Sequence, residues 1–306
     1  MPYHYLQKKL LLMRYFLFFL LPLLTGCSVA NLRTDAMAGQ SDQALEERGR
    51  ALLDESVRAM GLDKLMATKT YSMTTNFDWS TGWSMMPMNA LPGNKNKDLR
   101  FRFATNSFDG QLEWLEGPRT GEIRGVQSFV AYEREAAEAP ATEIGSNRYP
   151  WGLTAYHYIM ESPARILQSA PIIRYAGQRE FDGVNYDLVY ATWGNGDQRK
   201  DYDQYLLYIN PTTHFVDLSE ITITDFFLPM PNGMKNATVR YPERVLTSIG
   251  AYLPTVNVIQ FGKPKEKITK DVYTFTYRDF AFDDFDAEAL YPLEGLERYG
   301  DSKPAE

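Results

Sequence analysis

The chain has 306 residues, of which 44% are hydrophobic and 23% are charged. This composition is that of an ordinary globular protein, so it argues against overall disorder and predicts a sizeable core. The formal net charge is −7 and the sequence contains no basic stripe, which argues against nucleic-acid binding. Aromatic residues make up 14% of the chain, and this excess favours a protein rich in β-strands.

Residues 1–26 have the pattern of a bacterial secretory signal. Lys8, Lys9 and Arg14 give a basic beginning, and the run Tyr15 to Leu24 is apolar over ten residues. A helix of that length covers about 15 Å, roughly half of the hydrocarbon core of a bilayer, so the run is too short to span it. It is typical of the apolar region of a signal peptide.

The end of this segment resembles a lipobox, the processing site of bacterial lipoproteins. Its residues are Leu24, Thr25, Gly26 and Cys27. In that class the cysteine is acylated and becomes the first residue of the mature chain. The alternative is a plain signal peptide followed by an incidental cysteine. Cys27 is the only cysteine, so neither an intrachain disulfide nor a cysteine-based zinc cluster is expected.

The lipobox resemblance implies that acyl chains on Cys27 attach the protein to a membrane. Residues 1–26 contain three basic residues and no acidic one, so the mature chain is three units more negative than −7. Charge therefore gives it no attraction to anionic lipid, and acyl chains have to supply the attachment. Ser28, in place of an aspartate, implies an anchor in the outer membrane, with the body facing the periplasm.

The mature chain is expected to begin with a tether and one amphipathic helix. Residues 27–41 show no periodicity and are predicted to be the lipidated tether. From Asp42 to Met60, apolar residues recur at helical spacing, and the predicted buried stripe includes Leu52, Leu53 and Val57. Gly61 is placed to end this helix in a left-handed conformation.

After residue 70 the hydrophobic period changes to two, which predicts strands. A run of candidate strands, separated by turn residues, covers 71–79, 99–103, 111–114, 126–132, 172–180, 186–193, 205–209, 215–224, 237–246, 256–261 and 272–282. Between them, residues 149–170 have helical spacing, and Pro163 predicts two short helices that meet near Ser162. A helical turn is expected at residues 290–296. We therefore predict about nine to eleven antiparallel strands with two or three helices in one domain, residues 42–296, followed by a polar tail, 297–306.

No residue pattern indicates catalysis or a cofactor. The mature chain keeps only His157, expected to be packed or partly exposed in an apolar helix, and His214, expected at the surface after a turn. Neither a nucleophile elbow nor a phosphate-binding or dinucleotide-binding glycine motif is present. The acidic groups Asp197/Asp201/Asp203 and Asp283/Asp284/Asp286 lack the spacing of a calcium loop, so no metal site is predicted.

Two connections are unusually apolar. The segment between the first two strands carries Trp83, Met85, Met86, Met88 and Leu91, and a later one carries Phe226, Phe227 and Leu228. Connections are normally polar. Such loops either fold over an end of the sheet and close the core, or form an adaptable apolar surface at the mouth of a ligand-binding concavity. Inward faces of strands, such as Phe101/Phe103 and Tyr273/Phe275, are candidates to line such a concavity.

The order of these elements resembles the superfamily of outer-membrane lipoprotein-sorting proteins with the LolA/LolB-like fold. The resemblance rests on residues 163–167, on the strand–turn–strand 177–189 and on the hairpin 205–213. It implies a half-open antiparallel barrel, an α+β fold whose concave face is covered by helices, with the 42–60 helix among them. The apolar loop at 85–91 resembles the exposed loop of the membrane-bound member.

The sequence therefore predicts a non-catalytic, outer-membrane-anchored lipoprotein that binds a lipid or other amphiphile and takes part in lipid or lipoprotein transfer. One alternative is an interaction protein of the envelope that docks a protein partner through the apolar loops. A second is an envelope hydrolase with scattered carboxylates. No protein partner is named by the sequence.

Overall fold

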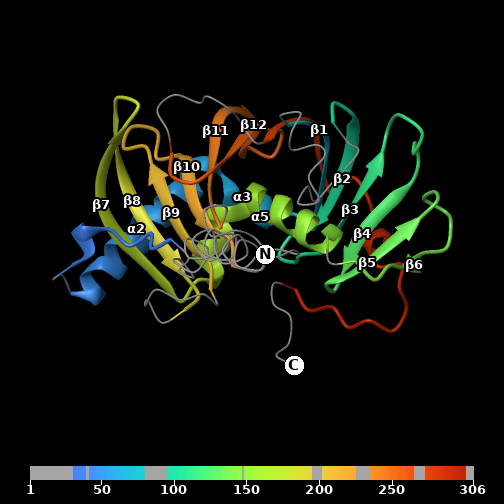
Figure 1. Ribbon diagram of the computed structural model, residues 1–306, viewed down its shortest axis with the longest axis horizontal. Helices are drawn as coiled ribbons and strands as arrows, with labels where there is room; N and C mark the ends of the chain where they lie inside the picture. Colours follow the sequence, from blue (N-terminus) through green and yellow to red (C-terminus); the bar gives the residue numbers. More distant parts are fainter. Residues whose placement is uncertain are drawn as a thin grey trace, which may run out of the picture.

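The protein is described by a computed structural model (Figure 1). The described residues are 30–38, 41–79, 95–146, 148–194, 202–224, 235–264 and 273–300. None of the helices in this part of the chain is long and apolar enough to cross a membrane.

Within the described residues, the body is one antiparallel sheet of 13 strands in the order β6-β5-β4-β3-β2-β1-β13-β12-β11-β10-β9-β8-β7. The strands are β1 (Thr70–Trp79), β2 (Asp98–Ala104), β3 (Gly110–Trp114), β4 (Ile123–Gln127), β5 (Val130–Arg134), β6 (Thr142–Glu143), β7 (Ile172–Phe181), β8 (Val184–Thr192), β9 (Gln204–Ile209), β10 (Val216–Thr222), β11 (Asn236–Leu246), β12 (Tyr252–Phe261) and β13 (Tyr273–Phe282). The helical segments are η2 (Asp35–Met37), α2 (Asp42–Met60), α3 (Leu62–Met66), α5 (Arg148–Ser169) and η4 (Ala287–Leu290).

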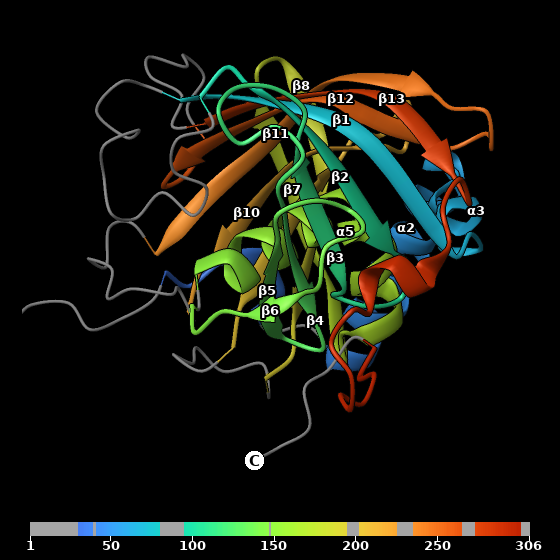
Figure 2. The same ribbon diagram turned by 90° about the vertical axis from the view of Figure 1, so that its right-hand side faces the viewer.

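The sheet is strongly curved and wraps around α5, which lies along its concave face (Figures 1 and 2). Strands β6 and β7 are the two ends of the strand order and do not pair with each other, so the barrel is half-open. The predicted fold class, one curved antiparallel sheet with helices on the concave face, is confirmed. The number of strands is higher than the predicted nine to eleven.

Part of the difference in strand number arises because the sequence pattern predicted one strand where the structure has a hairpin of two. Residues 126–132 are not one strand, because the chain turns at Ser128 and Phe129 between β4 and β5. Both turn residues have positive φ, 51° and 65°. This is the backbone of a tight hairpin turn that usually takes glycine or asparagine. A serine and a phenylalanine give no such signal, so the turn was missed. The two-residue strand β6 is not among the candidate strands of the sequence either.

The helix α5 corrects a second expectation. It runs without interruption over 22 residues and contains Pro163, where two helices were predicted to meet. Pro163 removes one backbone hydrogen bond, but the helix continues because it is held along its length by packing. Twelve of its residues are buried, including Pro163 itself. The predicted turn at 290–296 is instead the short helix η4 at 287–290.

The helix α2 has the predicted bounds and ends at Gly61 with φ 67°. It packs on β7, and Gly49 allows a close approach, because a Cβ atom there would lie 2.5 Å from the carbonyl carbon of Arg174. Leu53 and Val57 are buried in the core on the concave side of the sheet, as predicted, whereas Leu52 is only partly buried.

The convex face of β7–β9 carries a second, smaller core. Tyr190, Leu206 and Tyr208 belong to it, and so does Leu32 from the N-terminal segment. Residues 30–38, which we expected to belong to a tether, lie against this face. An aperiodic sequence gave no indication of that packing.

The two rims of the half-barrel differ in what covers them. One rim, which we call the Trp79 rim, is where β1, β8, β10 and β12 end and where β2, β9, β11 and β13 begin. The opposite rim, the Gly250 rim, is defined by the β11–β12 turn. There the Gly250 carbonyl lies so close to Gly61 that a Cβ atom on Gly61 would be 2.4 Å from it, and Lys64 donates a hydrogen bond to the same carbonyl. α2, α3 and η4 lie on the Gly250 side in Figure 2.

Candidate functional site

The middle of the concave face is a packed core. Phe77, Phe101 and Phe275 are fully buried, and the ring of Tyr156 on α5 packs on all three, with its centroid 4.8 Å from that of Phe275. The strand faces that were candidates to line a concavity do point inward. At Phe101, Phe103 and Phe275, however, α5 occupies the position that a ligand would need.

The concave face becomes less covered toward the Trp79 rim. Five large apolar side chains there pack on the core but remain partly exposed: Trp193, Tyr205, Ile221, Ile259 and Tyr273. They come from β9, β10, β12 and β13 and from the residue after β8. Tyr205 lies between Trp193 and Tyr158 of α5, with ring centroids 5.8 Å and 5.7 Å away. Tyr273 meets Trp79 edge to face at 5.9 Å.

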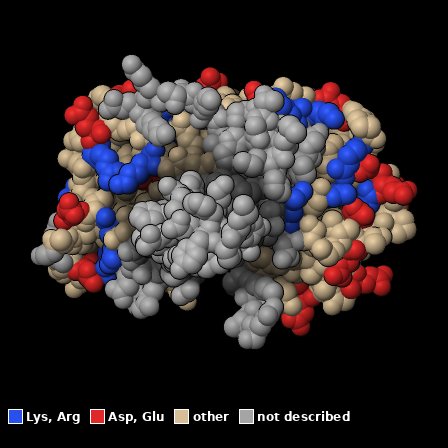
Figure 3. Space-filling model, viewed as in Figure 1, with Lys and Arg blue, Asp and Glu red and all other residues tan. Residues whose placement is uncertain are grey.

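This rim faces the viewer in Figure 3. Between the β7–β9 side and the β2–β5 side, the described surface that is visible belongs mainly to residues that are neither acidic nor basic. Lys and Arg side chains lie on both the β7–β9 side and the β2–β5 side, and many of the acidic side chains lie farther out. The five apolar side chains are therefore on a rim whose visible sides carry basic residues.

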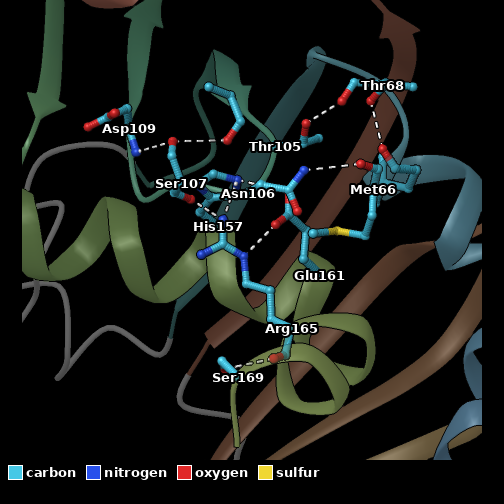
Figure 4. Close-up of polar contacts among 12 residues, drawn as sticks. Met66, Thr68, Thr105, Asn106, Ser107, Asp109, His157, Glu161, Arg165 and Ser169 are labelled. Carbon is cyan, nitrogen blue, oxygen red and sulfur yellow. Dashed lines mark hydrogen bonds and ion pairs between the residues drawn. The ribbon is translucent and has the colours of Figure 1, made fainter. Parts of the chain in front are cut away.

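A buried ionic group holds α5 to the sheet on the other side of Tyr156 (Figure 4). His157, Glu161 and Arg165 follow each other at four-residue intervals and are fully buried. His157 Nε2 lies 2.9 Å from Glu161 Oε1, and Arg165 Nε donates to Glu161 Oε2. Arg165 Nη2 also donates to the Ser107 carbonyl in the β2–β3 turn. The group thus connects one face of the helix to that turn.

The surroundings of this group set its charges. Burial lowers the pKa of His157, whose ring stacks on Phe103 with centroids 4.1 Å apart. Burial by itself would raise the pKa of Glu161, but its interactions with His157 and Arg165 outweigh this and hold that pKa below 4.5. At neutral pH the ionised Glu161–Arg165 pair therefore lies beside a neutral histidine. Because His157 Nε2 donates to the carboxylate, Nδ1 is the acceptor, and it has no partner among the described residues.

The β2–β3 turn is fastened to its other neighbours as well. Asn106 donates to the Met66 carbonyl of α3, and Thr105 donates to the Thr68 carbonyl. Asp109 accepts the backbone N–H of Ser128 at 2.6 Å. Figure 4 shows the contacts of Asn106 and Thr105 beside His157 and Arg165. They join α3, α5 and two hairpins, which is a structural role.

The ionisable hydroxyls on the concave face are also held in one protonation state. Burial raises the pKa of Tyr241 and Tyr277, and it raises the pKa of Tyr273 to about 12. These phenols are therefore neutral hydrogen-bond partners at physiological pH. Tyr277, for example, lies 3.2 Å from Asn257 Nδ2.

Of the acidic residues singled out from the sequence, Asp197 and Asp201 lie outside the described residues, and the others have structural partners, Asp203 among them through the Thr224 N–H. Asp283 accepts the backbone N–H groups of Lys69 and Thr70, and Asp284 accepts the Ser72 hydroxyl. Asp286 caps η4 through the N–H of Glu288. Within the described residues, no three His, Cys, Asp or Glu side chains are grouped so that they could hold a metal ion. His214 lies at the surface near Glu55, as expected.

The residues proposed for lipidation and ligand contact lie outside the described part of the chain. These are Leu24, Thr25, Gly26 and Cys27, then Trp83, Met85, Met86, Met88 and Leu91, and finally Phe226, Phe227 and Leu228. The strands that flank the two apolar connections, β1 and β2 for one and β10 and β11 for the other, meet these connections at the Trp79 rim. Both proposed loops are therefore attached to the same rim, which the sequence did not indicate.

The comparison with known proteins gives a likeness in fold. No family model matches the sequence, and no curated protein matches it. Among solved structures, a DUF1329 family protein from Desulfovibrio piger is 11% identical over 79% of this chain and 96% of its own, with a TM-score of 0.46. A putative outer membrane lipoprotein-sorting protein domain from Vibrio parahaemolyticus is 8% identical over 80% and 97%, with a TM-score of 0.46. A LolA superfamily protein from Nitrosomonas europaea is 9% identical over 77% and 96%, with a TM-score of 0.44.

Proposed function

We propose that the chain is a lipoprotein of the bacterial envelope that holds an apolar segment of a lipid or other amphiphile at the Trp79 rim. The observation that carries this proposal is the set of five large apolar side chains that stay partly exposed on the concave face there. Side chains of this kind normally complete a core, and a group of them left partly exposed at one end of a concave face is typical of a site for an apolar ligand.

The energetics of such a site require no reactive group. Removing apolar surface from water contributes about 25 cal/mol for each Å². An acyl chain laid along these side chains is therefore held because its apolar surface leaves water. The aromatic rings of Trp193, Tyr205 and Tyr273 offer wide, rigid contact surfaces. Basic side chains at the margin suit an anionic head group.

In this proposal the protein binds its ligand without catalysing a reaction. The buried carboxylate nearest the helix-covered centre, Glu161, is engaged by His157 and Arg165. The tyrosines of the concave face are held neutral by burial. Each of these groups has a structural role that explains its position, which supports a binding function over a hydrolase with scattered carboxylates.

The attachment to a membrane rests on the sequence. In our proposal Cys27 is acylated, and Ser28 at the next position places the anchor in the outer membrane, with the body in the periplasm. Changing Cys27 to Ala should leave a chain that takes up no radiolabelled palmitate and stays in the soluble or unprocessed fraction. Palmitate incorporation into that variant would contradict the assignment.

The binding function is tested on a purified chain that begins at Ser28. Organic extraction followed by mass spectrometry should release a co-purified amphiphile, and a fluorescent fatty acid should bind to the emptied protein. The double variant Ile221→Ser and Ile259→Ser should lower the affinity for the fluorescent fatty acid roughly tenfold, which corresponds to about 1.4 kcal/mol of binding free energy.

The matched control is Val245→Ser, on β11 toward the Gly250 rim, where the side chain is exposed. It should leave the affinity unchanged. Equal affinity of all three proteins, with no extracted amphiphile, would contradict the proposal. A single protein recovered by crosslinking from cells would then favour the docking alternative.

A further inference from the structure

The N-terminal segment is fixed to the sheet by specific contacts. Gln204 Nε2 donates to the Ala30 carbonyl at 3.1 Å, and Gln204 Oε1 accepts the Leu32 N–H at 3.0 Å. One side-chain amide thus binds the backbone of two residues of the segment. Gln204 is 1% exposed and also lies within hydrogen-bond reach of the Tyr190 hydroxyl.

Side chains of the segment add to this attachment. Leu32 is buried in the convex core with Leu206. The Thr34 hydroxyl donates to the Ala176 carbonyl at 2.6 Å. Ala36 lies so close to the backbone of Gly177 that a Cβ atom on Gly177 would be 2.5 Å from the Cβ of Ala36. The segment is therefore a strap on the wall of the half-barrel.

The place of attachment is at the Trp79 rim. Gln204 is the first residue of β9, and it pairs with Thr192, the last residue of β8. Cys27 precedes Ala30 by three residues. Three residues of fully extended chain reach no more than about 10 Å. An acyl group on Cys27 would thus enter a membrane close to this rim, whereas Ile209 at the far end of β9, five residues beyond Gln204, is about 17 Å more distant.

The positions of several lysine side chains also favour an orientation with the Trp79 rim toward the membrane. Described residues directly beside the Trp79 rim include Lys95, Lys97, Lys235 and Lys263. The Gly250 side carries the acidic run of Asp283, Asp284 and Asp286. Four lysines therefore lie beside the rim that carries the anchor, and one of them, Lys95, is paired with Asp78. Lysine side chains are attracted to anionic lipid head groups.

We propose that the strap Ala30–Leu32 on Gln204 orients the anchored protein so that the Trp79 rim rests on the phospholipid surface, with the Gly250 rim pointing away from it. The inference rests on the proposed acylation of Cys27. It gives the amphiphile a direct path between the bilayer and the apolar side chains of the rim, because the same rim carries both the anchor and those side chains.

The test uses the full acylated chain in vesicles of phosphatidylethanolamine and phosphatidylglycerol. Cys27 is the only cysteine and its sulfur is blocked by acylation, so a second cysteine can be labelled selectively. Tyr202→Cys, at a side chain 46% exposed beside the Trp79 rim, is compared with Thr212→Cys in the β9–β10 turn at the Gly250 rim. A fluorophore on each is quenched by lipids that carry a nitroxide on the head group.

We expect quenching at position 202 to exceed that at position 212 by at least fivefold. An insertion of twelve Gly/Ser residues between Val29 and Ala30 should reduce this ratio to below twofold, because it lengthens the connection but leaves the strap in place. Equal or reversed quenching in the acylated chain, or a ratio that the insertion does not change, would overturn the inference alone. A mass spectrum without acyl chains on Cys27 would contradict the proposed function and this inference together.

Discussion

The two rims of this half-barrel have the same strands but different surroundings. At the Gly250 rim, the Asn106 side chain in the β2–β3 turn donates a hydrogen bond to the Met66 carbonyl of α3, and Arg165 of the buried ion pair on α5 donates to the Ser107 carbonyl of the same turn. At the Trp79 rim, apolar side chains of four strands are only partly covered. The comparison indicates that the stabilising contacts of α5 and the proposed binding site lie toward opposite ends of the strands, while Phe215 and Phe282 toward the Gly250 rim are partly buried as well. Changes at the Gly250 side should affect unfolding, and changes at the Trp79 side should affect binding.

The largest expected effect is at Glu161. Glu161→Gln leaves the buried Arg165 guanidinium without its carboxylate, and breaking a buried pair in this way costs about 3–5 kcal/mol. Urea denaturation measures the loss. Asp54→Asn removes a surface ion pair with Arg58 on α2 and should cost about 0–1 kcal/mol. Similar losses for the two variants would show that the buried pair does not fasten α5.

The next effect is at the contact of α2 with the core. Leu53 is 0% exposed, and Leu53→Ala should lower the free energy of unfolding by about 2–5 kcal/mol because it leaves a cavity. Leu52→Ala, at a partly buried neighbour on the same helix, should cost clearly less. A loss below about 0.5 kcal/mol for Leu53→Ala would place the helix outside the core.

Acid should lower the free energy of unfolding in two steps, because His157 and Glu161 on α5 take up protons at different pH values. His157 has a pKa below 6.5 in the folded protein, so the unfolded chain binds the proton more readily and stability falls as the pH drops through about 6.5. Glu161 has a pKa below 4.5 in the folded protein, so a second loss follows as the pH drops below about 4.5. Thermal unfolding at pH 7.5, 5.5 and 4 measures both steps. His157→Gln should remove the first; a first step of unchanged size in that variant would assign it to other groups.

The smallest effect on stability is expected at the connection attached to the Trp79 rim. Changing Met85, Met86 and Met88 together to Ser should weaken binding of the fatty-acid probe, because these flexible apolar side chains are proposed to contact the ligand. The melting temperature should stay within about 2 °C of the original, since no core contact is expected to be lost. A large drop in melting temperature would instead make this connection part of the core.

Much of the sheet was predictable because alternation of apolar and polar residues depends only on one buried face. β1, β2, β9 and β13 lie within one or two residues of their predicted bounds. Three features were not predictable for physical reasons. Ser128 and Phe129 adopt a turn backbone that their side chains do not favour. Pro163 lies inside a helix because packing outweighs the loss of one hydrogen bond.

The third feature is the attachment of residues 30–38. It depends on the side chain of Gln204, which is distant in sequence, and on space left by Gly177. No local pattern records either contact. For the site, the rings named as candidates do point inward, but alternation alone does not tell which face of a strand is inward, and it did not reveal that α5 fills the centre. A signal for the ionic group was present, since His157, Glu161 and Arg165 repeat at four-residue spacing on one face of an apolar helix.

The half-open strand order leaves two sheet edges, and such edges are templates on which strands of another copy can add. Here one edge strand, β6, is only two residues long. The other, β7, is interrupted at Gly177, where its pairing with β8 shifts register, and the neighbouring Ala176 carbonyl is occupied by the Thr34 hydroxyl. Neither edge offers a long, regular row of free backbone groups. Strand addition from one copy to the next is thus disfavoured at both edges of the described sheet, which matters for a protein held at high local concentration.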